Sequence, residues 1–250
     1  MSWSPRALLA VLLAAHGCFW LRPEQEVDPL AAPLQQVDNA WRSRAVSGIQ
    51  PVQTLLDPLL AAAPTDSRVL WRMSRQAWLR GFLATDALEA QTSWESGREY
   101  ALTCLLTDPD VAAGFRENGW LLADPALSAV SPAQRPCLLW AAASGLALVE
   151  ARGAGGALDA EGACAMVERA STLVGPSEPG LIEWEVGTCA WWLTGDREIA
   201  LASWQEALAS GNPLYSLAPD AHDAGLKHTV APNPEYALEN ASVQARGTEP

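Results

Sequence analysis

The sequence is poor in histidine and lysine. It contains three histidines and a single lysine, Lys227, so almost every basic residue is an arginine. Acidic residues outnumber basic ones by 29 to 16, and the formal net charge at pH 7 is −13. Proteins that hold nucleic acid, or that dock electrostatically on anionic lipid, need clustered positive charge. We therefore expect no nucleic-acid partner and no electrostatic contact with a membrane surface.

Catalytic motifs are also lacking. The chain has no Gly-x-Ser-x-Gly elbow and no His-Glu-x-x-His motif, and its glycine-rich turn at Arg152–Gly156 lacks the Lys-Ser/Thr ending of a phosphate loop. Of the few histidines, His222 and His228 lie near Asp220 and Asp223 without the spacing of a recognised metal site. We expect no enzyme activity, no cofactor and no metal.

No apolar run reaches the roughly 20 residues that cross a bilayer as a helix. The most uniform run, Cys137–Val149, is apolar around nearly its whole circumference and is bracketed by Arg135 and Glu150. It predicts the central, buried helix of a helical protein. Its small-residue face allows close approach by other helices or by a ligand, and consists of Ala141, Ser144, Gly145 and Leu148.

Alternating strand patterns are scarce, whereas Ala and Leu are abundant and twelve Trp supply bulky anchors. We predict an all-α fold of tetratricopeptide-like helical hairpins, forming a compact α-solenoid or bundle. The spacing of one tetratricopeptide unit is visible near the end of the array. Its aromatic and small positions are Trp184, Trp191, Ala200, Trp204 and Ala207.

Parts of that spacing recur, which predicts three degenerate hairpins at 67–109, 137–176 and 181–213. Trp71 and Trp78 repeat the seven-residue step of the two leading aromatics. The second-helix pattern is expected at Ala163, Val167 and Ala170, and again at Gly97, Ala101 and Cys104. In the middle hairpin we expect Trp140 to be the leading aromatic and 181–194 to pack beside its first helix.

The N-terminus has the form of an export signal. Arg6 supplies a positive start, Ala7–Ala15 an apolar core, and a Gly precedes Cys18 as in a bacterial lipoprotein signal. We expect a signal peptide at 1–17, lipidation of Cys18, a tether at 18–33 and a helical domain at 34–250. Ordinary secretion and a cytosolic start are the alternatives.

Removal of Cys18 leaves Cys104, Cys137, Cys164 and Cys189. An even count in an oxidising compartment permits disulfides. Each of these cysteines lies inside an apolar helical pattern, where a free cysteine behaves as a small hydrophobic residue. The pattern therefore favours four free, buried cysteines.

Four arginines lie on one predicted helix in an otherwise acidic chain: Arg68, Arg72, Arg75 and Arg80. They have the charge to grip an anion. The simpler interpretation is a solvated face held by salt bridges.

Several segments resemble a known family, the T component (TatT) of tripartite ATP-independent periplasmic (TRAP) transporters. They lie between Trp71 and Arg246, and comprise the Cys137–Ala141 stretch, the turn at Gly153, the Gly195-Asp196-x-x-x-Ala200 hairpin and the Leu238–Ala241 segment. The resemblance implies a periplasmic lipoprotein of tetratricopeptide-like hairpins. It also implies association with the solute-binding P component and an apolar channel for hydrophobic ligands.

Two functions follow as hypotheses. The first is a lipid-anchored accessory protein, facing the periplasm from the outer membrane, that binds a solute-binding partner and a hydrophobic or organic-acid ligand. Its expected ligand wall is Trp140, Ser144, Trp184 and Trp191. The second is an interaction scaffold of the cell envelope with a fully packed interior. An empty channel beside Ser144 favours the first, and a solid core favours the second; a homo-oligomer is left open.

Replacement of Cys18 by Ala tests the anchor. The variant cannot be acylated, so we expect it to move from the membrane fraction to the soluble fraction on cell fractionation. Wild-type protein, processed in parallel, is the control. A variant that stays with the membranes would contradict lipid anchoring at this cysteine.

Overall fold

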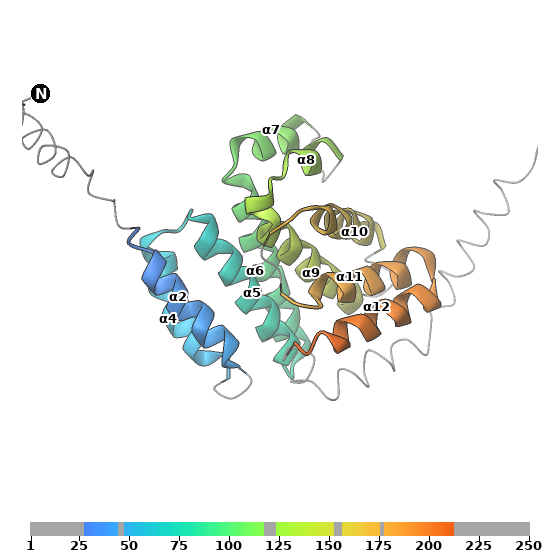
Figure 1. The fold of residues 1–250 in the computed structure, drawn as a ribbon, viewed down its shortest axis with the longest axis horizontal. Helices are drawn as coiled ribbons and strands as arrows, with labels where there is room; N and C mark the ends of the chain where they lie inside the picture. Colours follow the sequence, from blue (N-terminus) through green and yellow to red (C-terminus); the bar gives the residue numbers. More distant parts are fainter. Residues whose placement is uncertain (1–27, 45–47, 118–123, 153–156, 176–177, 213–250) are drawn as a thin grey trace, which may run out of the picture.

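The computed structural model describes residues 28–44, 48–117, 124–152, 157–175 and 178–212. Within these residues the fold is all-α, a compact array of helical hairpins, as the sequence predicts (Figure 1). None of the described helices is long and apolar enough to cross a membrane. The expected signal peptide, Cys18, and the histidines His222 and His228 lie outside the described residues.

The helices follow one another as antiparallel neighbours. The three predicted hairpins are formed by α5 with α6, by α9 with α10, and by α11 and its π-helical end η3 with α12. The helices are α2 (Ala31–Arg42), α4 (Gln50–Ala62), α5 (Ser67–Leu83), α6 (Ala87–Leu106), α7 (Pro109–Glu117), α8 (Asp124–Ala129), the 3-10 turn η1 (Pro132–Gln134), α9 (Arg135–Arg152), α10 (Ala157–Thr172), α11 (Leu181–Cys189), η3 (Ala190–Thr194) and α12 (Arg197–Ala209).

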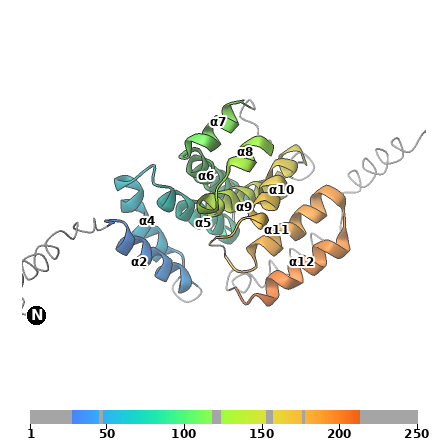
Figure 2. The same ribbon diagram turned by 45° about the horizontal axis from the view of Figure 1, so that its top comes forward.

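Helix α9 is the predicted central helix. Almost all of its side chains from Arg135 to Val149 are buried. Its main neighbours are α6 and α10, with smaller contacts to α5 and α11, and both ribbon views place it in the middle of the array (Figure 1 and Figure 2). The expected contact with 181–194 is present through α11, but α6 and α10 pack against α9 more extensively than α11 does.

Helices fill the small-residue face of α9. A Cβ atom added to Gly97 of α6 would lie 2.8 Å from the Ser144 hydroxyl oxygen, and one added to Gly145 would lie 3.4 Å from the Ala163 Cβ of α10. Such distances leave room for a glycine and little else at Gly97. The space beside Ser144 and Gly145 is thus a helix crossing with close backbone approach.

The first and third hairpins share one detailed contact. In each, a second-helix tryptophan donates its indole N–H to a first-helix tryptophan carbonyl at 3.2 Å: Trp94 to Trp78, and Trp204 to Trp184. In each, a glycine three residues after the first-helix tryptophan makes room for that indole, because a Cβ on Gly81 or Gly187 would lie within 3 Å of it.

This contact corrects the predicted register of the first hairpin. Trp78, and not Trp71, is the counterpart of Trp184. In the first hairpin, the second-helix positions are therefore Ala90, Trp94 and Gly97. They lie one heptad before the predicted positions Gly97, Ala101 and Cys104. The error arose because small residues recur every seven positions along α6, so the pattern fits equally well one heptad later. In the middle hairpin Gly145 meets Ala163, which places Ala142, and not Trp140, at the leading aromatic position.

Aspartates cap the N-termini of the second helices in the first and third hairpins. Asp86 accepts a hydrogen bond from the Glu89 amide, and Asp196 accepts from the amides of Glu198 and Ile199. Such N-caps satisfy amides that have no partner inside the helix. Because Asp86 caps α6, the helix begins at Ala87.

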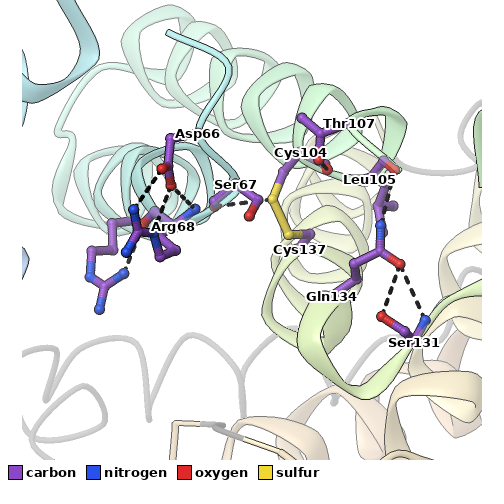
Figure 3. Close-up of a disulfide and its surroundings, with 10 residues drawn as sticks. Asp66, Ser67, Arg68, Cys104, Leu105, Thr107, Ser131, Gln134 and Cys137 are labelled. Carbon is purple, nitrogen blue, oxygen red and sulfur yellow. Dashed lines mark hydrogen bonds and ion pairs between the residues drawn. A yellow bond between two sulfur atoms is a disulfide. The ribbon is translucent and has the colours of Figure 1, made fainter. Parts of the chain in front are cut away.

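All four core cysteines are paired, which overturns the expectation of free thiols. Cys104 of α6 joins Cys137 of α9, as Figure 3 shows, and Cys164 of α10 joins Cys189 of α11. The Cα atoms lie 5.7 and 5.6 Å apart, the separation typical of disulfides. Each cysteine does lie in an apolar helical pattern, but it faces a cysteine on the adjacent hairpin. Each disulfide therefore connects two consecutive hairpins.

Removal of either disulfide is expected to destabilise the fold. The bonds close loops of 33 and 25 residues, and such closure lowers the entropy of the unfolded chain. Double Cys→Ala variants at 104 and 137, or at 164 and 189, should each lose about 3 to 4 kcal/mol of unfolding free energy in urea. Reductant should lower the urea midpoint of the wild type. It should not change the urea midpoint of a variant that lacks all four cysteines. An equal midpoint for wild type with and without reductant would contradict both bonds.

Candidate functional site: an arginine–tryptophan pocket

A cavity of about 530 Å³ lies where α2, α5 and α9 meet the two ends of the third hairpin. This volume is within the range of small-molecule sites. It is lined by Asp38, Trp41 and Arg42 of α2, Arg44 just after it, Trp71, Arg72 and Arg75 of α5, Pro136, Leu139 and Trp140 of α9, and Glu178, Pro179, Ser210, Gly211 and Asn212 at the ends of the third hairpin.

Guanidinium groups and indole rings alternate along this cavity. The Arg44 and Arg75 guanidinium carbons each lie 4.1 Å from the centre of the Trp41 ring. Arg75 also lies 4.8 Å from the Trp71 ring, and Arg72 lies 4.1 Å from it. Each contact is within the distance at which an arginine is attracted to the face of an indole. The order Arg44, Trp41, Arg75, Trp71, Arg72 forms what we call the arginine–tryptophan ladder.

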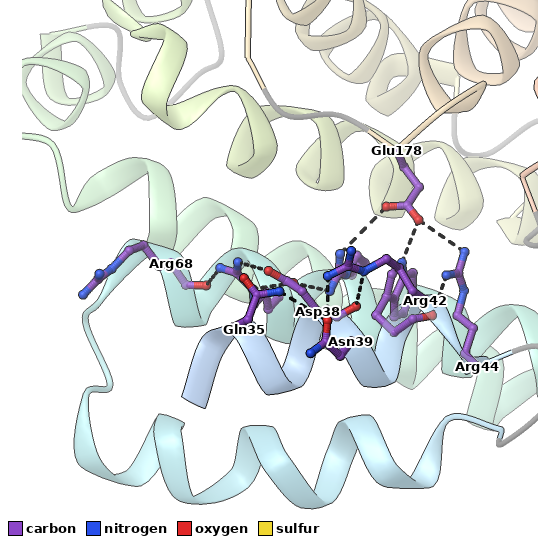
Figure 4. A network of polar contacts seen from close by, with 10 residues as sticks. Gln35, Asp38, Asn39, Arg42, Arg44, Arg68 and Glu178 are labelled. Atoms are coloured by element: carbon purple, nitrogen blue, oxygen red, sulfur yellow. Dashed lines mark hydrogen bonds and ion pairs between the residues drawn. The ribbon is translucent and has the colours of Figure 1, made fainter. Parts of the chain in front are cut away.

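Two carboxylates bridge the arginines of the ladder. Asp38 accepts from Arg72 at 2.9 Å and from Arg75 at 3.2 Å. Glu178 accepts from the Trp41 indole at 2.6 Å and from Arg44 at 3.2 Å, and lies 3.8 Å from Arg75. Figure 4 shows Glu178 pointing from the segment before α11 toward α2.

Two of the three ladder arginines, Arg44 and Arg75, are buried. Only 2% of the Arg44 side chain and 6% of the Arg75 side chain are exposed. Burial lowers the pKa of Arg75 to about 10, although Glu178 and Asp38 act in the opposite direction. Burial acts to raise the pKa of the Asp38 carboxyl. Arg72 and Arg75 together lower this pKa by more, so it lies below its usual value. Arg75 and Asp38 are therefore charged at neutral pH.

Two buried donors of the ladder are unsatisfied. Nε of Arg44 and Nε of Arg75 have no hydrogen-bond partner among the residues that the structure describes. An unsatisfied buried donor is costly, more so on a charged group. The cavity walls carry four guanidinium groups and two carboxylates, so the pocket is positive by two charges in a chain of net charge −13. This arrangement has the donors and the charge to hold a carboxylate.

The structure separates the four residues of the predicted ligand wall. Trp140 lines the cavity and contacts the rings of Trp41 and Trp78, at 6.5 and 5.6 Å between centroids. Ser144 is buried at the crossing of α9 and α6. Trp184 and Trp191 lie in the third hairpin, where both contact Trp204. The four do not line one cavity.

The four arginines of the predicted anion-binding helix also diverge. Arg72 and Arg75 face the cavity, whereas Arg68 pairs with Asp66 and Asp28, and Arg80 donates to the Ser93 hydroxyl. The salt-bridged interpretation therefore holds for Arg68, and it also holds for Arg72 and Arg75, which pair with Asp38.

Sequence reasoning missed Trp41, Arg44, Asp38 and Glu178 as site residues. The sequence carried a signal for Trp41 and Arg44, because they lie three residues apart at the end of α2 and just after it. Helix α5 carries a similar cluster of arginine and tryptophan. Glu178 lies between prolines in a loop, where the sequence gives no sign of its partners.

Glu185 of α11 is a second buried ionisable group, outside the cavity. Burial raises the pKa of its carboxyl to about 8, and the charge of Glu150 adds to the rise. The carboxyl is therefore mainly protonated at neutral pH. In the unfolded chain its ordinary pKa is 4.5, so unfolding at neutral pH releases its proton.

Replacement of Glu185 by Gln is expected to change the pH dependence of stability. Because the folded-state pKa is raised, wild type should lose stability as the pH rises from about 4.5 to about 8, and the variant should not lose that part. The two proteins should have similar urea midpoints below pH 4.5, with the variant more stable at pH 8. Glu183→Gln, on the same helix but half-buried, is the control. Parallel stability curves for wild type and Glu185→Gln would contradict a protonated Glu185.

Comparison of the chain with known protein families and with curated proteins finds no match. The resemblance to the TRAP transporter T component therefore stays a prediction from the sequence. Among the described residues, no group of three or more His, Cys, Asp or Glu is placed to hold a metal ion. The chemistry of the pocket is what the structure offers for a functional assignment: buried arginines, indole walls and a positive local charge.

Proposed function

We propose that this protein is an exported, non-enzymatic binding protein that holds a small organic acid in its arginine–tryptophan pocket. The observation that carries the proposal is the set of four guanidinium groups, among them the buried Arg44 and Arg75, that line a cavity of about 530 Å³ beside only two carboxylates. Arginine is suited to a carboxylate because its planar fork can donate two parallel hydrogen bonds.

The apolar part of the ligand has a surface to lie on. Trp71, Trp140, Pro136 and Leu139 line the same cavity. Binding sites typically combine such apolar walls with a few polar groups that fix orientation. An acid with a flat apolar body fits both features.

Two features support export to an oxidising compartment. The N-terminus has the form of a lipoprotein signal, and the structure pairs all four core cysteines. Disulfides persist in secreted and periplasmic proteins and are rare in the reducing cytosol. We propose a lipid-anchored protein of the cell envelope that faces the periplasm.

The resemblance to the TRAP transporter T component supports a role in solute uptake beside a periplasmic solute-binding protein. In that role the pocket would hold an organic acid on its way to or from the partner. The channel implied by the resemblance would pass beside Ser144, where helices pack closely, so the proposed ligand site is the cavity between α2, α5 and α9.

The second candidate function is an interaction scaffold without a small-molecule ligand. The packed small-residue face of α9 favours it, because the array is solid at the crossing of α6, α9 and α10. The two candidates differ in one respect: a scaffold gives no reason for a carboxylate to bind at Arg75.

Calorimetric titration with indole-3-acetate tests the organic-acid function. We expect wild type to bind the acid and to bind the isosteric neutral indole-3-acetamide at least tenfold more weakly. Arg75→Lys keeps the charge that pairs with Asp38 and Glu178 but loses the planar fork, so it should bind the acid about tenfold more weakly. Circular dichroism should show the same helical content.

Arg68→Lys is the matched control, because Arg68 lies on the same helix, outside the cavity, in an exposed salt bridge. It should bind as wild type does. Equal affinity for acid and amide, or no binding of either by folded protein, would leave the scaffold function as the better account.

A further inference from the structure

The arginines of the ladder already hold a carboxylate from the chain itself. Glu178 lies between helices α10 and α11, far from α2 and α5 in the sequence. Its carboxylate accepts the Trp41 indole N–H at 2.6 Å and the Arg44 guanidinium at 3.2 Å. Its second oxygen lies 3.8 Å from Arg75. Only 15% of the side chain is exposed.

These contacts are the ones that a bound organic acid would make. A carboxylate at this position meets an indole donor, the Arg44 fork and the charge of Arg75 at once. The contact with Arg75 is the loosest of the three, and Nε of Arg75 has no partner among the described residues. With the internal carboxylate in place, Nε of Arg44 and Nε of Arg75 both lack a hydrogen-bond partner among the described residues.

The second carboxylate of the pocket has a different geometry. Asp38 lies on α2 beside the arginines it binds, and its two oxygens accept from Arg72 at 2.9 and 2.5 Å. Its position is fixed by the helix. Glu178, by contrast, is carried by the short segment that leads into the third hairpin and is not part of a ladder helix.

We propose that Glu178 is a built-in competitor: the carboxylate of the ligand replaces it on Arg44 and Arg75, and the flat apolar body of the ligand lies against Trp71 and Trp140. This inference rests on the proposed organic-acid function. It adds that Glu178 occupies the carboxylate position before the ligand binds. The ligand class is a monocarboxylate with an aromatic or similarly flat body.

Replacement also changes how the third hairpin is held. Arg44 binds Asn212 at the end of α12 at 3.1 Å, and Asn212 donates to the Pro179 carbonyl at 2.8 Å. Glu178 and Asn212 thus tie both ends of the third hairpin to Arg44. Departure of Glu178 removes one of these two ties and couples ligand binding to the position of the hairpin.

Replacement of Glu178 by Gln tests the competitor. The amide oxygen still accepts the Trp41 indole N–H, but the charge that competes with the ligand is gone. We expect indole-3-acetate to bind this variant about tenfold more tightly than wild type, as measured by calorimetry, because an internal carboxylate no longer opposes the ligand carboxylate. Glu183→Gln, which removes one charge from the same hairpin outside the cavity, should leave the affinity unchanged.

The outcomes separate the inference from the function beneath it. If folded wild type binds the acid and Glu178→Gln binds it equally or more weakly, the competitor is overturned while the organic-acid function stands. If neither protein binds the acid, the function itself fails.

A measurement on wild type covers the case in which Glu178→Gln does not fold. The Trp41 indole N–H donates to Glu178, so its proton resonance should shift when indole-3-acetate binds. A saturated protein whose Trp41 indole resonance has not moved would overturn the replacement of Glu178.

Discussion

Helix α9 has no polar face to turn toward water, and the need to bury it on all sides determines how its neighbours are arranged. Its small residues let α6 and α10 approach to backbone distance, with Gly97 against Ser144 and Ala163 against Gly145. Its N-terminal half, through Pro136, Leu139 and Trp140, forms one wall of the cavity. The helix therefore serves the core with one face and the candidate site with another. Helices occupy the crossing at Ser144, and the proposed ligand site lies in the cavity where α2 and the third hairpin meet the array.

The hairpins repeat one packing device, and the disulfides fix how they follow one another. A glycine on the first helix receives an indole from the second, at Gly81 with Trp94 and at Gly187 with Trp204. The disulfides do not lie within hairpins, where this contact already joins the helices. They lie between hairpins, from α6 to α9 and from α10 to α11. Stapled in this way, the array keeps the third hairpin close enough for Glu178 and Asn212 to reach Arg44.

Local patterns made most of the fold predictable, and long-range pairing limited the rest. The apolar circumference of Cys137–Val149 predicted a buried central helix, and the recurring small residues predicted three hairpins. The heptad register of α6 could not be fixed, because a seven-residue repeat of small residues fits two positions. The cysteine pairs depend on which helices become neighbours, and the pocket depends on a loop carboxylate that meets α2 from 134 residues away. Such contacts leave no periodic trace in the sequence.

The proposed role of the positive, indole-walled pocket in this acidic protein is to receive an organic carboxylate. A need to join the helices does not by itself explain this pocket, because apolar packing could join the same helices without burying charge. The cavity beside Arg44 and Arg75, with its walls of Trp71 and Trp140, is what distinguishes a binding site from a structural cluster of ion pairs. The most direct test is a crystal structure of the protein with indole-3-acetate. In that structure, the ligand carboxylate should lie within hydrogen-bond distance of the Arg75 and Arg44 guanidinium groups. A ligand found elsewhere, for example on Trp184 and Trp204 of the third hairpin, with Glu178 still on Arg44, would contradict it.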